Sequence, residues 1–153
     1  FLKLALVNIK CQMEQSIRLV STTQEISAPP AQFEEEWVTR WQFAKPLIKE
    51  ALSHTDCYNI KDIEEGIKKG VFHLWTGEKS AMITEIIKYP RLSAINLLFC
   101  GGDYEELQSM LPSIEQFAKH FGCKRLYGGG RKGWLRKLKP LGFVQEYMIR
   151  KEI

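Results

Sequence analysis

Two short stretches of the sequence carry residues that could bind an anion. The first is Cys100-Gly101-Gly102-Asp103-Tyr104, a glycine pair that ends an apolar run and opens a segment with helical spacing. Glycines let a backbone approach a ligand closely, and the unpaired amides in the first turn of a helix are donors for phosphate. The pattern therefore predicts a phosphate-binding loop. A tight turn without a ligand is the alternative, and the Asp103 carboxylate would repel an anion.

The second stretch is a basic segment. Residues 116–145 contain eight Lys or Arg and no Asp or Glu, whereas the rest of the chain carries 14 basic and 18 acidic residues. The net charge of +4 thus hides an asymmetry that favours an anionic partner, either a nucleotide-like cofactor or a nucleic acid. A solvated helix face is the alternative. Trp134 lies between Arg131 and Arg136 and could stack on a base, but helical spacing places it with Leu138 on a face that should pack inward.

Weaker signals concern catalysis. Glu85 and His73 lie in strand-like runs and are candidates for a general base, and Tyr104, Tyr127 or Tyr147 could act as a general acid. None of these residues has a spacing that specifies such a role, so a structural role is the alternative for each.

The composition sets limits on the class of protein. The chain has 153 residues, of which 44% are hydrophobic and 26% charged, as in an ordinary globular domain. Its four cysteines include no Cys-x-x-Cys pair and its three histidines show no ligand spacing, so we expect reduced thiols and no metal. No apolar run approaches the roughly 20 residues of a membrane span, and we expect a cytoplasmic protein with no membrane partner.

The N-terminal half reads as strands and helices in one domain. We interpret residues 1–15 as an extension or an added strand, and residues 16–153 as a single domain that opens with a strand over residues 16–21. Apolar residues at helical spacing follow from Gln32 to Leu52, where Pro46 predicts a kink or two consecutive helices. A short helix is predicted over residues 62–70.

The remaining elements surround the two anion-binding candidates. Three strand-like runs cover residues 71–76, 81–89 and 93–100, joined by links short enough for antiparallel hairpins. A helix then begins with Asp103 as N-cap and Glu106 in a capping box, and Pro112 predicts a kink or a restart. A strand over residues 124–127, the basic helix and a final strand over residues 143–153 complete a sheet of six or seven strands.

This order of elements resembles the GNAT superfamily of acetyl-CoA-dependent N-acetyltransferases. The resemblance covers roughly residues 16–153 and is best from residue 93 onward. Residues 130–136, Gly-Arg-Lys-Gly-Trp-Leu-Arg, followed by Leu141-Gly142-Phe143, look like the tail of a GNAT-like branch found in bacteriophage and prophage genomes. The resemblance implies an α+β, α/β/α layered, acyl-CoA N-acyltransferase fold with a mixed, mostly antiparallel twisted sheet.

The resemblance also implies a site. Acetyl-CoA or another acyl-CoA would donate an acyl group to a primary amine, with Glu85 and Tyr147 as the candidate catalytic residues. The cofactor-binding candidates are Cys100, Gly101, Gly102, Asp103, Tyr104, Arg131 and Lys132. The chain departs from the family in two places: the loop lacks the leading Arg or Gln of the pattern Arg/Gln-x-x-Gly-x-Gly/Ala, and Leu138 stands where a general-acid tyrosine is frequent.

A second interpretation is a catalytically silent fold. In that case the basic helix would bind nucleic acid or a virion protein, and no acyl transfer would occur. A homodimer is compatible with either interpretation.

Overall fold

The computed structural model describes residues 31–130 and 132–153. The elements, in chain order, are α2 (Ala31–Leu52), α3 (Ile60–Lys68), β1 (Phe72–Thr76), β2 (Ala81–Lys88), β3 (Ser93–Gly101), α4 (Tyr104–His120), β4 (Cys123–Gly128), α5 (Lys132–Leu138) and the 3-10 turn η1 (Lys139–Leu141). The extension expected over residues 1–15 and the strand expected over residues 16–21 lie outside the described residues.

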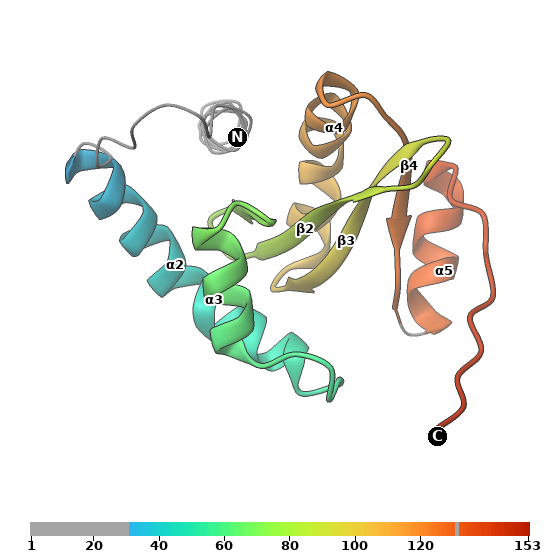
Figure 1. The fold of residues 1–153 in the computed structure, drawn as a ribbon, viewed down its shortest axis with the longest axis horizontal. Helices are drawn as coiled ribbons and strands as arrows, with labels where there is room; N and C mark the ends of the chain where they lie inside the picture. The colour runs from blue at the N-terminus through green and yellow to red at the C-terminus, as the bar shows by residue number, and fades with distance from the viewer. Residues whose placement is uncertain (1–30, 131) are drawn as a thin grey trace.

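A mixed sheet forms the centre of the molecule (Figure 1). Its four strands lie in the order β1-β2-β3-β4. β1 and β2 pair antiparallel, as do β2 and β3, whereas β3 and β4 pair parallel through the crossover helix α4. The mixed, mostly antiparallel sheet that the sequence predicts is therefore confirmed.

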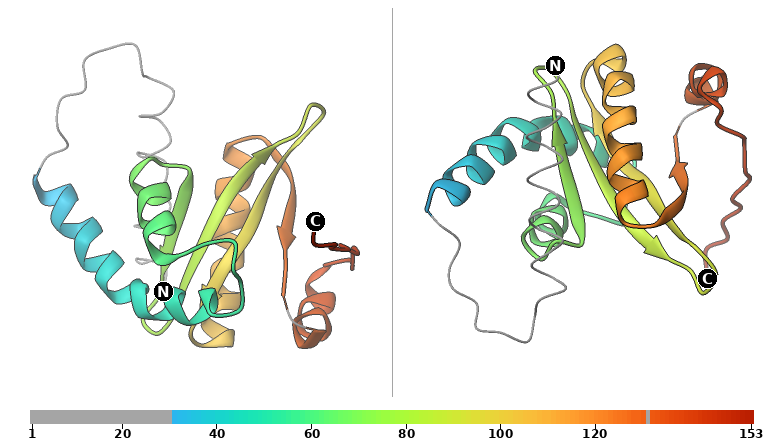
Figure 2. Two further views of the ribbon diagram at one scale, coloured as in Figure 1. Left: turned by 60° about the horizontal axis from the view of Figure 1, so that its bottom comes forward. Right: turned by 90° about the horizontal axis from the view of Figure 1, so that it is seen from above.

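Helices cover both faces of this sheet (Figure 2). α2 and α3 pack on one face, and α4 packs on the other. The first core contains Trp41, Ala44, Ile48, Leu52, Ile63, Ile67, Phe72, Leu74, Ala81 and Ile83. The second contains Trp75, Met82, Ile95, Leu107, Met110, Ile114, Phe117, Ala118 and Cys123. Alternate strand residues enter opposite cores, which gives the α/β/α layering expected from the sequence.

Both long helices continue through a proline. Pro46 lies within α2 and Pro112 within α4. Both prolines are exposed, so their rings lie on the solvent side of each helix and not in the core. The alternative of two consecutive helices at Pro46 is therefore wrong, and α4 does not restart at Pro112.

The predicted final strand is not formed. Residues 143–153 are irregular and follow η1 as an extended tail (Figure 1). Among the described residues the sheet has four strands rather than the six or seven expected. Strand-like composition is not sufficient for a strand, because the backbone must also pair with a neighbouring edge.

Candidate functional site

The parallel pair β3–β4 opens towards its C-terminal end. Pairing runs from Ser93 opposite Cys123 to Leu97 opposite Gly128, and beyond Leu97 β3 continues to Gly101 paired with β2 only. On the other side of β3 the register with β2 skips Leu98, because Ile83 faces Phe99 while the next residue of β2 faces Leu97. Leu98 is therefore a β-bulge beside an opening in the sheet.

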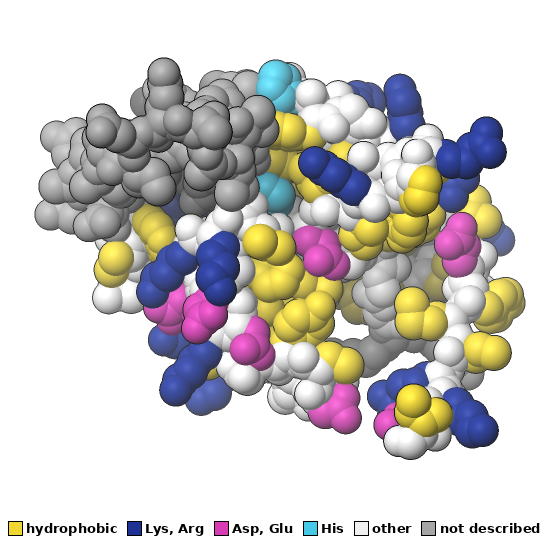
Figure 3. All heavy atoms as spheres, in the orientation of Figure 1, with side chains coloured by type: hydrophobic (Ala, Val, Ile, Leu, Met, Phe, Trp, Pro, Cys, Tyr) yellow, Lys and Arg dark blue, Asp and Glu magenta, His cyan; other side chains and the backbone are white. Residues whose placement is uncertain are grey.

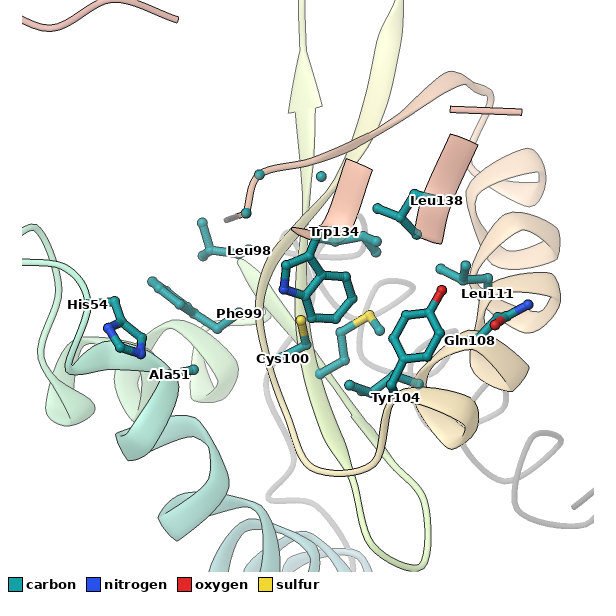
Figure 4. Close-up of a pocket in the computed structure, with 16 residues that line it drawn as sticks. Ala51, His54, Leu98, Phe99, Cys100, Tyr104, Gln108, Leu111, Trp134 and Leu138 are labelled. Carbon is teal, nitrogen blue, oxygen red and sulfur yellow. The ribbon is translucent and has the colours of Figure 1, made fainter. Parts of the chain in front are cut away.

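A pocket of about 190 Å³ occupies this opening (Figure 4). Its walls come from β3, from α4, from the glycines after β4 and from α5, and its far end reaches the end of α2. The lining residues are Ala51, His54, Met82, Leu97, Leu98, Phe99, Cys100, Tyr104, Leu107, Gln108, Leu111, Gly128, Gly129, Gly130, Trp134 and Leu138. The pocket is predominantly apolar and connects the two faces of the sheet.

Trp134 projects into the middle of the pocket, between Cys100 and Tyr104 (Figure 4). Its ring lies 5.6 Å from the Tyr104 ring, nearly at right angles to it. The Tyr104 hydroxyl donates to the Lys137 carbonyl at 3.3 Å, and Lys137 Nζ lies 4.0 Å from the centre of the Tyr104 ring. These contacts attach α5 to the start of α4. The expectation that Trp134 and Leu138 face inward is confirmed.

The glycine pair lies at the start of α4, as expected, but packing alone requires both residues. Gly102 has φ +111°, and a Cβ atom there would overlap the Lys79 carbonyl oxygen and lie 2.6 Å from Ser80 Cα. A Cβ atom on Gly101 would lie 2.5 Å from the Leu47 carbonyl oxygen. Neither position can carry a side chain, with or without a ligand. The two glycines are therefore no evidence for phosphate binding by themselves.

Asp103 supplies a negative charge where a phosphate would bind. Its Oδ1 accepts from the Glu106 amide at 3.0 Å, and its own amide donates to Ser80 Oγ at 2.8 Å. Two donors of the predicted phosphate loop are thus bonded within the protein. The Asp103 carboxylate also lies at the N-terminal end of α4, where the positive end of the helix dipole would otherwise favour a bound anion. The N-cap expected from the sequence is confirmed, and it competes with the ligand that the same pattern suggests.

Glu106 does not complete the expected capping box. Glu106 is only 8% exposed, and its carboxylate instead accepts from the amides of Glu78 and Lys79, at 2.7 and 2.9 Å, in the turn between β1 and β2. Burial raises the pKa of this carboxyl, but hydrogen bonds from Ser80 and from the two amides outweigh it and hold the pKa below its ordinary value. The Glu106 side chain therefore links the turn between β1 and β2 to the first turn of α4.

Glu85 lies on the opposite face of the sheet, among partners that the sequence did not single out. Its Oε1 accepts from Asn96 Nδ2 at 2.9 Å, across the β2–β3 pair. Burial and the Glu85 charge both raise the pKa of Tyr58. The Tyr58 ring packs at 5.5 Å from Phe99, which also lines the pocket. Tyr58, Glu85, Asn96 and Phe99 form the Glu85 cluster. Phe99 is the member of this cluster that lines the pocket, whereas Glu85 itself does not.

The other candidate residues are more distant. Tyr147 is 86% exposed in the C-terminal tail and does not line the pocket, so its catalytic role stays a prediction. His73 is buried against Phe117, 5.0 Å between ring centres, and desolvation lowers its pKa to about 4. Arg131 and the side chain of Lys132 lie outside the described part of the structure.

Two further kinds of feature do not occur in the described part of the chain. Within residues 31–130 and 132–153, no group of three or more His, Cys, Asp or Glu side chains could hold a metal ion. No helix in the same ranges is long and apolar enough to cross a membrane.

Comparison with known proteins identifies the fold. No protein-family model and no curated protein sequence matches the chain. The Thermus thermophilus protein TTHA1254 superposes with a TM-score of 0.53, and a single-residue variant of it with 0.54; both are 11% identical and cover 75% of this chain and 90% of their own. An acetyltransferase from Trypanosoma brucei superposes with a TM-score of 0.51 at 13% identity, covering 68% of this chain and 89% of its own.

The fold is similar to that of the Trypanosoma brucei acetyltransferase. The acetyltransferase-like fold expected from the sequence is thus confirmed. At such low identities the likeness concerns the fold alone. The resemblance to a phage-associated branch and the cytoplasmic location stay predictions.

Proposed function

We propose that the chain binds an acyl-CoA in the opening between β3 and β4 and transfers the acyl group to an amine. The observation that carries this proposal is the apolar pocket, which is lined by Tyr104 at the start of α4, by the two separating parallel strands, and by Phe99, whose ring contacts Tyr58 of the Glu85 cluster. A thioester arm could enter from one face of the sheet while an amine approaches from the other. The acetyltransferase fold supports the same assignment.

The pocket must enlarge for this ligand. Its volume of about 190 Å³ is below the roughly 300 to 1,000 Å³ of typical ligand pockets. Trp134 occupies the middle of the opening and is only partly buried, so its rotation outward would lengthen the pocket. Asp103 would weaken binding of a pyrophosphate at the start of α4, and we therefore expect modest affinity.

Residues of this chain could perform the proton transfers. A bound acyl-CoA supplies an activated carbonyl carbon. Glu85, directly or through a water, would take a proton from the attacking amine as the new N–C bond forms. The bulge takes Leu98 out of the regular ladder, which makes its amide a candidate donor to the carbonyl oxygen. When the C–S bond breaks, the sulfur takes up a proton, for which Tyr104 is the candidate donor because it lines the pocket.

The test uses acetyl-CoA titration by calorimetry with Gly129→Val. Gly129 lines the pocket, and a Cβ atom there meets nothing within 4 Å, so the substitution narrows the entrance without a clash. Gly133→Val is the matched control, because Gly133 also has open space but does not line the pocket. We expect Gly129→Val to lose binding and Gly133→Val to keep it.

Turnover is tested separately with Glu85→Gln and a panel of amines. We expect the variant to bind acetyl-CoA as the wild type does but to release coenzyme A far more slowly. Absence of acetyl-CoA binding by the wild type, or equal binding by Gly129→Val, would refute the proposed site. Binding without turnover in any amine would leave only the binding half of the proposal standing.

A further inference from the structure

The edge strand β4 has an open side. The sheet order ends at β4, which pairs with β3 only, and no other strand among the described residues covers its outer edge. Such an edge presents backbone donors and acceptors to any extended chain of suitable sequence. Lys124 and Arg125 lie on this strand and are exposed, so an acidic or mixed-charge segment is favoured over a basic one.

A groove of about 460 Å³ runs along this edge. One wall is formed by β4, from Arg125 to Gly128, and the other by the start of the C-terminal tail, residues 141–144 and Glu146, with Glu115 of α4 beside them. The tail therefore lies across a space from β4 instead of pairing with it. Figure 2 shows the tail next to β4 and α5 in both views. The space lies where an additional strand would continue the sheet.

The C-terminal tail has the composition of a strand without a partner. Val144, Tyr147, Met148, Ile149 and Ile153 are 86–118% exposed. Apolar side chains stand out along the tail in the space-filling view (Figure 3). Exposure of five large apolar side chains in one short segment is unfavourable in water and marks an interaction surface.

The alternation of the tail fits the sheet. In an extended chain, residues 143, 145, 147, 149, 151 and 153 share one face; they are Phe, Gln, Tyr, Ile, Lys and Ile, so four of the six are apolar. The other face carries Val144, Glu146, Met148, Arg150 and Glu152, of which three are charged. On β4, Leu126 packs against the core beneath α4. A tail strand added beside β4 could therefore extend that core with Tyr147, Ile149 and Ile153. Its other face, with Arg150 and Glu152, has the mixed charge that the basic edge tolerates.

We propose that residues 147–153 of one copy add as a strand to the β4 edge of a second copy, in a reciprocal exchange that forms a homodimer. A second copy is favoured over the same chain because residues 141–146 already form the outer wall of their own groove. Reciprocal exchange would cover both open edges and bury both sets of exposed apolar side chains. This interaction is independent of the proposed acyl transfer.

The test compares Ile149→Lys with Met148→Lys in the full chain by sedimentation equilibrium. Both side chains are 96–97% exposed in the single chain, so neither change should affect its folding, and they lie on opposite faces of an extended tail. We expect a wild-type dimer whose dissociation constant Ile149→Lys raises by about a hundredfold to ten-thousandfold, because the reciprocal dimer buries two Ile149 side chains and the substitution removes both. Met148→Lys should stay within about threefold of the wild type.

Three results would overturn the proposal. The first is a wild type that is monomeric. If Ile149→Lys also lowers the melting temperature of that monomer, the tail pairs with β4 of its own chain and not with a second copy. The second is a dimer unaffected by Ile149→Lys. The third is equal weakening by both variants, which would indicate general adhesion of an apolar tail rather than strand addition.

Discussion

Replacing Glu106 by Gln should release the turn between β1 and β2 from the start of α4. The Glu106 carboxylate accepts the amides of Glu78 and Lys79 at 2.7 and 2.9 Å, and a Cβ atom on Gly77 would lie 2.5 Å from its carboxyl carbon. Gln keeps the shape and one acceptor oxygen. Its NH₂ group, however, must face one of the two amide donors, so one charge-assisted hydrogen bond is lost.

The loss of this hydrogen bond sets the expected decrease in the free energy of unfolding of Glu106→Gln. A hydrogen bond to a charged group contributes about 1.5 to 3 kcal/mol. Glu78 and Lys79 are exposed, so the released amide can bond to water, and we expect the lower half of this range, about 1.5 to 2 kcal/mol. The pKa of Glu106 lies below its ordinary value of 4.5, so this stability is present above pH 4.5 and is lost as the pH falls through the lower pKa of the folded state.

Urea unfolding of the wild type and Glu106→Gln at pH 7 and at about pH 3 measures both effects. Glu105→Gln is the matched control, because Glu105 lies in the same helical turn but is exposed. We expect the control to change stability by less than about 0.5 kcal/mol. The difference between the wild type and Glu106→Gln should be smaller at the lower pH. Equal losses in the two variants at pH 7 would refute the argument that Glu106 holds the turn.

Two other predictions concern charge near the proposed ligand. Asp103→Asn keeps an N-cap side chain but removes the negative charge at the start of α4, so we expect unchanged thermal stability and several-fold stronger acetyl-CoA binding by calorimetry; unchanged affinity would mean that no phosphate binds there. Arg136→Glu combined with Lys139→Glu should leave acetyl-CoA binding intact, since neither residue lines the pocket. A salt series of DNA and RNA binding on the same double variant tests the nucleic-acid interpretation, which predicts a salt slope reduced by roughly one to two units.

Local periodicity was sufficient to predict most of the fold. The stripe Leu107, Leu111, Ile114 and Phe117 is buried in α4, as its three- and four-residue spacing indicates. The hairpins followed from short links between strand-like runs. Each of these two signals is made of residues that are close together in the sequence, so both elements can be predicted without knowing which distant residues they contact.

Features that depend on distant partners were not predictable in this way. Residues 143–153 have the composition of a strand, but a strand requires an adjacent edge, and composition does not show whether one is available. The capping-box pattern at Glu106 was present, but the amides of a turn 27 and 28 residues away compete for the same carboxylate. Tyr58 and Asn96 join Glu85 only through strand register and helix packing, for which the sequence has no local signal.

The opening between β3 and β4 also divides the molecule into parts of unequal stability. β4 is attached through five residue pairs with β3 and through packing on α4, and α5 and the tail follow it. β2, in contrast, is hydrogen-bonded along both edges. We therefore expect β4, α5 and the tail to open together while β1, β2 and β3 stay folded. In native-state hydrogen exchange, the amides of β4 would lose protection at lower denaturant than those of β2, and a ligand that bridges the opening would slow exchange in both strands together.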